Sequence, residues 1–269
     1  MELCRCNRPG LSGDRRVSRA CAHCGLVSAL RCRSSAAAQN CPNAATYDAP
    51  RIESGPLKGL LKDHYQVIYA DPAWIFETYS KEGKDRSPEA HYDCMSIEDI
   101  KALPVKEIAA PNAVLLMWCI DTHIPYLCDV MDAWGFTFKT RGFEWIKLNK
   151  RAEEKKLLAG DPAAYFTGMG HWSRANGEDC WLGTTGRPKR MSGGVRRLTV
   201  TPVREHSRKP DEMYDKIEEL VQGPYVDLFS RAGHRPGWDR VGNQLGKFEE
   251  GHGDLERVHL VEALKQDLL

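Results

Sequence analysis

The stretch Val67–Trp74 reads VIYADPAW, and the rest of the chain is organised around it. The β-favouring apolar residues Tyr65–Ala70 stop abruptly at Asp71-Pro72, which predicts a buried strand that ends in a carboxylate. Open α/β sheets bind their ligands at this carboxyl edge. Pro72 has no N–H and disfavours a helical conformation at Asp71, so strand and loop separate there. We therefore expect a carboxylate, a backbone carbonyl and Trp74 on one tight turn.

A turn of this kind suits a planar amine. An exocyclic amino group has two N–H donors, so the Asp71 carboxylate and the Pro72 carbonyl can each accept one while the Trp74 indole packs on the ring. An Asp-Pro turn beside a core tryptophan, with no chemical role, explains the same residues equally well. The turn alone leaves both interpretations open.

The composition indicates one large α/β domain in an intracellular protein. The chain has 269 residues, with 38 Lys+Arg against 37 Asp+Glu, so net charge alone identifies no partner. No apolar run reaches membrane-spanning length, and the first residues, MELCRCNRPG, lack the apolar core of a signal peptide. We expect a cytoplasmic location and no membrane partner. In a reducing compartment the 10 cysteines are thiols or metal ligands rather than disulfides.

The segment 1–45 is rich in cysteine and arginine and has almost no large apolar residues, so it cannot build a core by itself. Two close cysteine pairs, C-x-C and C-x-x-C, resemble the two halves of a structural zinc site with four thiolate ligands: Cys4, Cys6, Cys21 and Cys24. Other ligand sets are open, because His23, Cys32 and Cys41 lie in the same segment. A thiol-rich tail without metal is the competing interpretation.

The zinc interpretation predicts one metal ion for each chain. Elemental analysis of protein purified without chelator is expected to give a ratio near one, and a Cys21→Ser/Cys24→Ser variant is expected to lose the metal while the following domain stays folded. A ratio near zero in the unchanged protein would contradict the assignment.

Strands and helices alternate along the remaining chain, which is the pattern of a doubly wound, mostly parallel sheet of about six or seven strands. A polar stretch at 77–90 predicts an active-site loop ahead of His91-Tyr92. Apolar runs predict further strands at 113–119, 136–147, 180–183, 198–203 and 225–229. Start, stop and spacing signals predict helices from Ser96, over 123–134 up to Gly135, over 210–221 with Pro210 in the first position, and over 255–269.

The stretch from Arg187 to Lys209 is the most basic part of the chain. Cations of this density on glycine-containing loops suit the phosphates of a polyanion, and we expect them near the cofactor edge. A solvated surface is the competing interpretation. The candidate nucleic-acid contacts, apart from Lys209, are Arg187, Lys189, Arg190, Arg196, Arg197, Arg204 and Arg208.

Taken together, the blocks of sequence resemble the adenine-N6 methyltransferase family that includes the catalytic subunit of the eukaryotic messenger-RNA methyltransferase and many bacterial and phage relatives. The resemblance runs from about Tyr65 to Leu245, through VIYADPAW, HYDCMS, LLMWC, GFEWIK, TGMGHW, EHSRKPDEMYDKIE, DLFSR and GWDRVGNQL. Bacterial and phage members are the closer fit, because the region from Thr167 to Lys209 carries the arginine-rich insert typical of them. This fit is compatible with a phage- or prophage-encoded chain.

The resemblance implies a Rossmann-like fold that uses S-adenosylmethionine to methylate nucleic acid. By this likeness Asp71 and Pro72 hold the target amine, Trp74 shapes the base pocket and Tyr92 lies against the acceptor base. The implied cofactor contacts are Asp71, through the methionine ammonium, and Lys209, Phe229, Arg231, His234, Asn243 and Gln244. The spacing between Arg231 and His234 differs by one residue from the spacing in the family pattern.

The family pattern is Asp-Pro-Pro-Trp, and here Ala73 replaces the second proline. Alanine keeps the backbone carbonyl but frees φ, so we expect a less rigid loop and an active enzyme. The expected domains are a cysteine-rich segment at 1–45, a methyltransferase domain at 46–250 and a terminal helix at 251–269.

The resemblance favours adenine N6 in DNA over RNA as the acceptor. A catalytically silent member that binds nucleic acid as a partner subunit is the alternative, although such a member is expected to lose some of Asp71, Pro72, Lys209 and Asn243, all of which are present. Methylation of cytosine N4 or of a protein amide is compatible with the turn itself, but the HYDCMS and HSRKP blocks argue against it.

Overall fold

The computed structural model describes residues 49–75, 94–168, 170 and 172–248. The cysteine-rich segment, the loop at 77–90, His91, Tyr92 and the helix expected at 255–269 lie outside the described residues. None of the described helices is long and apolar enough to cross a membrane.

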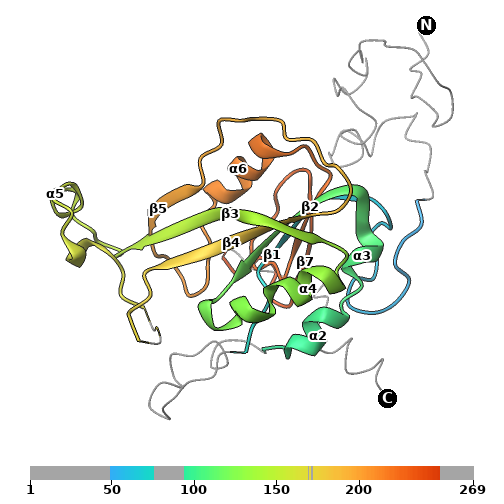
Figure 1. The fold of residues 1–269 in the computed structure, drawn as a ribbon, viewed down its shortest axis with the longest axis horizontal. Coiled ribbons are helices and arrows are strands. Elements are labelled where there is room, and N and C mark those ends of the chain that lie inside the picture. The colour runs from blue at the N-terminus through green and yellow to red at the C-terminus, as the bar shows by residue number, and fades with distance from the viewer. Residues whose placement is uncertain (1–48, 76–93, 169, 171, 249–269) are drawn as a thin grey trace, which may run out of the picture.

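A seven-stranded sheet in the order β5-β3-β4-β2-β1-β6-β7 forms the centre of the described fold (Figure 1). The neighbours β1–β2, β1–β6, β6–β7 and β3–β5 pair in parallel, whereas β4 is antiparallel to both β2 and β3. The expected α/β fold is therefore confirmed, but the sheet is mixed. The strands are β1 Tyr65–Ala70, β2 Ala109–Cys119, β3 Thr137–Leu148, β4 Gly177–Thr184, β5 Leu198–Pro202, β6 Tyr225–Leu228 and β7 Trp238–Val241.

Apolar side chains of β1 and β2 point alternately to the two faces of the sheet, because successive residues of a strand face opposite sides. On one face Ile68 and Met117 pack in a core with the helices α2, α3 and α4. On the other face Tyr69 and Trp118 pack with α6. Burial on both faces explains the continuous apolar runs of these strands.

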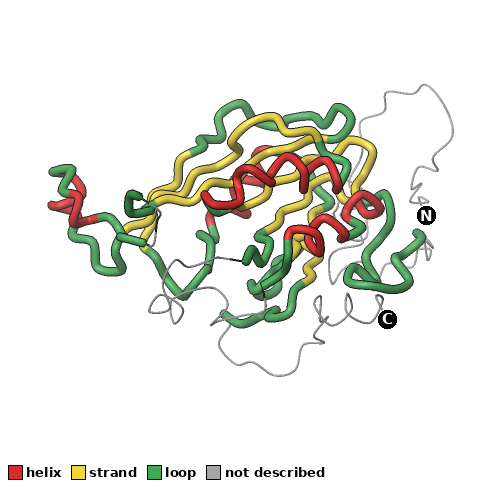
Figure 2. The backbone as a smooth tube through the Cα atoms, turned by 60° about the horizontal axis from the view of Figure 1, so that its bottom comes forward, coloured by secondary structure: helices red, strands yellow, loops and turns green. Residues whose placement is uncertain are grey.

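Helices cover both faces of the sheet, as Figure 2 also shows, while α5 projects away from it beyond the end of β3. Ser96 caps α2 as expected, accepting a hydrogen bond from the Asp99 amide. Gly135 follows α4 with a φ of 81°, a conformation that glycine adopts without strain. The helical elements are α2 Ile97–Ala102, α3 Val105–Ile108, η3 Asp121–Tyr126, α4 Leu127–Ala133, α5 Glu154–Leu158, η4 Pro162–Ala164 and α6 Glu212–Leu220.

Three details differ from the expectation. The helix expected over 123–134 begins as a 3₁₀ segment that contains Pro125, whose missing N–H interrupts the α-helical ladder. Pro210 is not the first residue of α6, because Asp211 is the N-cap. The short edge strand β7 was not predicted, since its four residues, WDRV, include two charged side chains.

The antiparallel direction of β4 determines which residues reach the carboxyl edge of the parallel strands. Its first residues pair with Ile146 and Trp145 near the end of β3, and its last residue, Thr184, pairs with Thr137 at the start of β3. Glu178 therefore lies at the carboxyl edge with Asp71. The segment after Thr184 begins at the opposite, amino edge.

Candidate active site

The chain turns sharply at the end of β1, which lies between β2 and β6 in the sheet. The Asp71 amide still reaches the Leu228 carbonyl of β6 at 3.4 Å, after which the Trp74 amide donates to the Pro72 carbonyl at 2.8 Å. The Met95 amide donates to the Ala73 carbonyl at 2.8 Å. Two hydrogen bonds thus hold the loop that has alanine in place of proline. The Pro72 carbonyl keeps one lone pair for a second donor.

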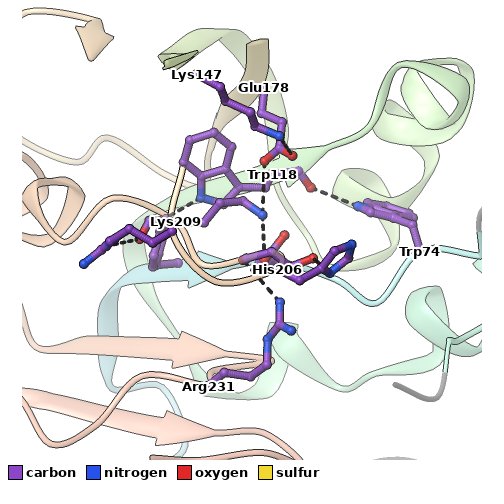
Figure 3. Close-up of polar contacts among 11 residues, drawn as sticks. Trp74, Trp118, Lys147, Glu178, His206, Lys209 and Arg231 are labelled. Atoms are coloured by element: carbon purple, nitrogen blue, oxygen red, sulfur yellow. Dashed lines mark hydrogen bonds and ion pairs between the residues drawn. The ribbon is translucent and has the colours of Figure 1, made fainter. Parts of the chain in front are cut away.

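Four side chains of alternating charge meet at this edge. Lys209 Nζ lies 2.7 Å from Asp71 Oδ2 and 3.2 Å from Glu178 Oε2. Glu178 Oε1 accepts from Lys147, and Figure 3 shows the Lys147 and Glu178 side chains pointing toward each other beside Trp118. The exposed fractions of the Asp71, Lys209 and Glu178 side chains are 26%, 14% and 23%, so water screens these contacts only in part.

The mutual attraction outweighs the cost of burying these charges. Burial by itself would raise the pKa of Glu178, but Lys209 and Lys147 hold it at about 2. Burial by itself would lower the pKa of Lys209, but Asp71 and Glu178 raise it above the usual value. Glu178 and Lys209 are therefore both charged at neutral pH, and the ion pairs fix the direction of the Asp71 carboxylate.

Two tryptophans form the apolar surroundings of the turn. Trp74 is only 4% exposed, donates to the Trp118 carbonyl at 3.0 Å, and lies 5.2 Å from the His123 ring. Lys209 Nζ lies 5.3 Å from the centre of the Trp118 ring, within cation–π range. Trp74 is thus a packed core residue in this structure. Its contact with a base stays a prediction, as does that of Tyr92, which lies outside the described residues.

A cavity of about 410 Å³ opens beside Asp71, between the ends of β1 and β6 and the segment that leads into α6. Four further residues of the predicted cofactor set line it: Lys209, Phe229, Arg231 and His234. Phe229 has a φ of 62° directly after β6, an uncommon conformation for a non-glycine residue that often occurs at functional sites.

Asn243 and Gln244 do not belong to this lining. They follow Gly242, where a Cβ would come within 2.1 Å of the Ser230 carbonyl oxygen, so only glycine allows this approach of the two backbones. The close contact places Asn243 next to the loop that begins with Ser230.

The basic stretch is divided between distant parts of the sheet. The Arg187 amide donates to Asn112 Oδ1 near the start of β2, so Arg187, Lys189 and Arg190 lie toward the amino edge. The expectation that the whole stretch lies near the cofactor edge is wrong for these three residues. The reason is the antiparallel course of β4, which carries the chain away from the site.

The other arginines of the stretch lie closer to the site. Lys216 of α6 donates to the Arg196 carbonyl at 3.1 Å, and the Glu144 amide donates to the Arg197 carbonyl at 3.2 Å. Both arginine side chains are exposed. Arg204 and Arg208 are further along the chain, and both form ion pairs with Asp211, at 2.5 Å and 3.2 Å.

These positions allow a matched test of phosphate binding. An Arg196→Ala/Arg197→Ala variant is expected to weaken binding to all nucleic-acid sequences and to reduce the slope of log affinity against log salt by about one for each phosphate interaction removed. A Lys189→Ala/Arg190→Ala variant removes the same charge at the amino edge and is expected to have the smaller effect. Equal affinity and slope in the first variant and the unchanged protein would make Arg196 and Arg197 a solvated surface.

Glu178, Lys147 and Trp118 were not identified by sequence reasoning. Glu178 opens the stretch EDCWL and Lys147 closes the stretch GFEWIK, so each lies in a strand beside apolar residues. A charged residue within such a strand is a signal for a buried ion pair. The signal does not identify the partner, because pairing follows from strand register. Among the described residues there is no group of three or more potential metal ligands. The predicted zinc ligands lie outside those residues.

Comparison with known proteins places the chain in a family. The sequence model of the MT-A70 family matches residues 65–244, from the first strand to the amides after β7. An MT-A70-like N(6)-adenosine-methyltransferase of Drosophila melanogaster is 28% identical over 184 residues, which are 67% of this chain and 27% of that protein. The human N(6)-adenosine-methyltransferase catalytic subunit METTL3 is 26% identical over 184 residues, 67% of this chain and 28% of the relative.

A relative of different size is the type II methyltransferase M.MunI of Mycoplasma sp, which is 26% identical over 202 residues. The match covers 69% of this chain and 80% of that protein. By contrast, this chain spans about a quarter of the length of the two N(6)-adenosine-methyltransferases. Since the family model covers well over half of the sequence, including Asp71, Lys209 and both strands that carry the cavity, the chain belongs to the MT-A70 family.

Proposed function

We propose that this chain transfers a methyl group from S-adenosylmethionine to N6 of adenine in DNA. The observation that carries the proposal is the contact between Asp71 and Lys209, 138 residues apart in sequence, at the edge of a cavity next to the central strand. Asp71 follows β1, which lies between β2 and β6 in the sheet. Open α/β sheets bind ligands at the carboxyl ends of such central strands. A silent family member has no need of this ion-paired carboxylate, so we favour the active enzyme.

The residues of the turn are arranged to hold an amino group. Lys209 occupies Asp71 Oδ2, which leaves Oδ1 as an acceptor, and the Pro72 carbonyl keeps its second lone pair. Acceptors on both N–H groups of adenine favour a pyramidal nitrogen, whose lone pair is otherwise delocalised into the ring. Fixed groups that favour the geometry of the transition state are the principal source of rate acceleration here.

S-adenosylmethionine supplies a methyl group on a sulfonium centre, and the N–C bond forms as the S–C bond breaks. The protein contributes proximity and alignment, because the turn and the cavity meet at Asp71. The nitrogen loses its proton after methylation, so the site needs no strong base. In duplex DNA the adenine has to leave the base stack to reach this turn.

The cavity fits a cofactor with this chemistry. Its volume lies in the range of about 300–1,000 Å³ that is usual for small-molecule sites. The lining includes the carboxylates Asp71 and Asp227 and the cations Lys209, Arg231 and Arg240, which complement a ligand with ammonium, sulfonium and carboxylate groups. We propose Asp71, Lys209, Phe229, Arg231 and His234 as cofactor contacts. For Asn243 and Gln244 we propose an indirect contribution through the Ser230 loop.

DNA is proposed as the substrate because a relative that matches this chain over most of its own length is named a type II methyltransferase. The relatives named N(6)-adenosine-methyltransferases are much longer than the matched region. We further propose that residues 46–250 carry the activity and that the segments 1–45 and 251–269 are accessory to it.

The test incubates the purified chain with methyl-labelled cofactor and with DNA or RNA of matched sequence. The nucleic acid is then digested, and the methylated nucleoside is identified by mass spectrometry. We expect N6-methyldeoxyadenosine. Label in adenosine from RNA alone would reject DNA as the substrate, and label in cytosine would reject the assignment of the base.

A further inference from the structure

Arg240 is a cavity residue that the predicted site does not include. It lies on β7 directly opposite Asp227 of β6 in the parallel ladder, so both side chains point to the α6 face of the sheet. Both line the cavity, together with Tyr214 of α6. The Arg240 guanidinium lies 5.2 Å from the centre of the Tyr214 ring.

Part of the Arg240 guanidinium is buried without hydrogen-bond partners, although the residue as a whole is partly exposed. Its Nε and Nη1 atoms are inaccessible to water, and neither has a hydrogen-bond partner among the described residues. Arg235 offers a direct comparison, because it also packs on Tyr214, at 5.4 Å, yet donates to Glu218 and Asp215. Buried donors without acceptors are costly, and those in a native structure call for an explanation such as a ligand.

The neighbouring carboxylate does not fill these donors. Tyr214 and Ser230 both donate to Asp227 Oδ2, at 2.8 Å and 2.6 Å, and there is no ion pair within 4 Å between Asp227 and Arg240 in the described part of the chain. A cation and a carboxylate thus lie side by side in the cavity wall with hydrogen-bonding capacity left. An α-amino acid group, with one ammonium and one carboxylate, has the complementary charges.

We propose that Arg240 binds the carboxylate of the methionine part of the cofactor, an assignment that rests on the proposed function. A guanidinium presents parallel N–H donors that match the two oxygens of a carboxylate. Arg240 lies two strands from β1, in register with Tyr69, which is two residues before Asp71. With a rise of ~3.3 Å per residue and a strand spacing of ~4.8 Å, the Cα atoms of Arg240 and Asp71 are about 12 Å apart. One ligand in the cavity can therefore have its amino acid group at Arg240 and Asp227 and its reacting end at Asp71. This assignment places the methionine ammonium at Asp227 rather than at Asp71, where the family resemblance placed it.

The test compares two ligands that differ in the amino acid group. S-adenosylhomocysteine carries it, and 5′-methylthioadenosine does not. Calorimetry with the full chain is expected to show that Arg240→Met weakens binding of S-adenosylhomocysteine about 10- to 100-fold, the usual loss for a hydrogen-bonded charge. Binding of 5′-methylthioadenosine is expected to stay within about twofold. An Arg235→Met variant is the matched control and is expected to leave the ratio of the two affinities unchanged.

The Arg240→Lys variant keeps the charge without the paired donors. We expect it to lose an intermediate part of the affinity for S-adenosylhomocysteine, with the same selectivity between the two ligands. It replaces Arg240→Met in the test if circular dichroism shows that Arg240→Met does not fold. Equal weakening of both ligands would overturn the assignment and make Arg240 a structural residue. A wild-type chain that binds both ligands equally well would also overturn it. A wild-type chain that binds neither would reject the proposed function itself, so the two failures are distinguishable.

Discussion

Replacing Asp71 by alanine is expected to slow methyl transfer to adenine by about a hundredfold or more. The carboxylate is the acceptor that the ion pair with Lys209 holds in place, and removal of one fixed transition-state interaction commonly costs ~10²–10³ in rate. The fold is expected to survive, because Asp71 follows the strand and is not part of either apolar core. The measurement is the rate of methyl transfer to an adenine-containing duplex and to the matching single strand.

An Asp71→Asn variant refines the test. Asparagine keeps a side-chain oxygen but loses the charge that binds Lys209, so we expect a rate between those of the wild type and Asp71→Ala. Cofactor affinity, measured in parallel by calorimetry, is expected to fall only modestly in Asp71→Ala, since Lys209, Phe229 and Arg231 still line the cavity. A wild-type rate for Asp71→Ala would reject the mechanism proposed here.

Replacing Lys209 by methionine is expected to lower the free energy of unfolding by roughly 2–4 kcal/mol. Removing one partner of a buried ion pair commonly costs ~3–5 kcal/mol, because the other charge is left without compensation. Partial exposure of the three side chains reduces this effect. In Lys209→Met two carboxylates, Asp71 and Glu178, lose their shared cation. Urea unfolding measures the change.

A double variant separates charge from packing. Adding Asp71→Asn to Lys209→Met removes the carboxylate that loses its only ion pair among the described residues, whereas Glu178 keeps its pair with Lys147, so the double variant is expected to recover part of the lost stability. A double variant that is less stable than Lys209→Met would show that the ion pair is not the cause. Methyl transfer is expected to be strongly reduced in both, because the Asp71 carboxylate is no longer fixed in direction in Lys209→Met and is absent from the double variant.

The same cluster predicts a direction of pH dependence. The pKa of Glu178 is lowered in the folded protein to about 2, so its contribution is complete above the unfolded value of ~4.3 and is lost as the pH falls toward 2. The pKa of Lys209 is raised, so its contribution is complete below the ordinary lysine value and is lost only in strong alkali. Urea unfolding between pH 5 and pH 2 is therefore expected to show a steeper loss of stability in the wild type than in Glu178→Gln.

Local patterns in the sequence determined the elements that hold the chemistry. The apolar run that ends at Asp71-Pro72 predicted β1 and its turn, because strand preference and the missing N–H of proline act over a few residues. Ser96 and Gly135 marked the ends of helices for similarly local reasons. The pattern of strands and helices gave the α/β class, and blocks such as HSRKP and DLFSR indicated the family that the family model then showed.

Only the tertiary structure decided which distant residues meet. Strand direction and register depend on packing between segments far apart in the chain, and no local pattern records them. The antiparallel course of β4 therefore brought Glu178 to Lys209 and carried Arg187 toward the opposite edge of the sheet. The edge strand β7 is too short and too polar to be recognised alone, yet its pairing with β6 places Arg240 in the wall of the cavity.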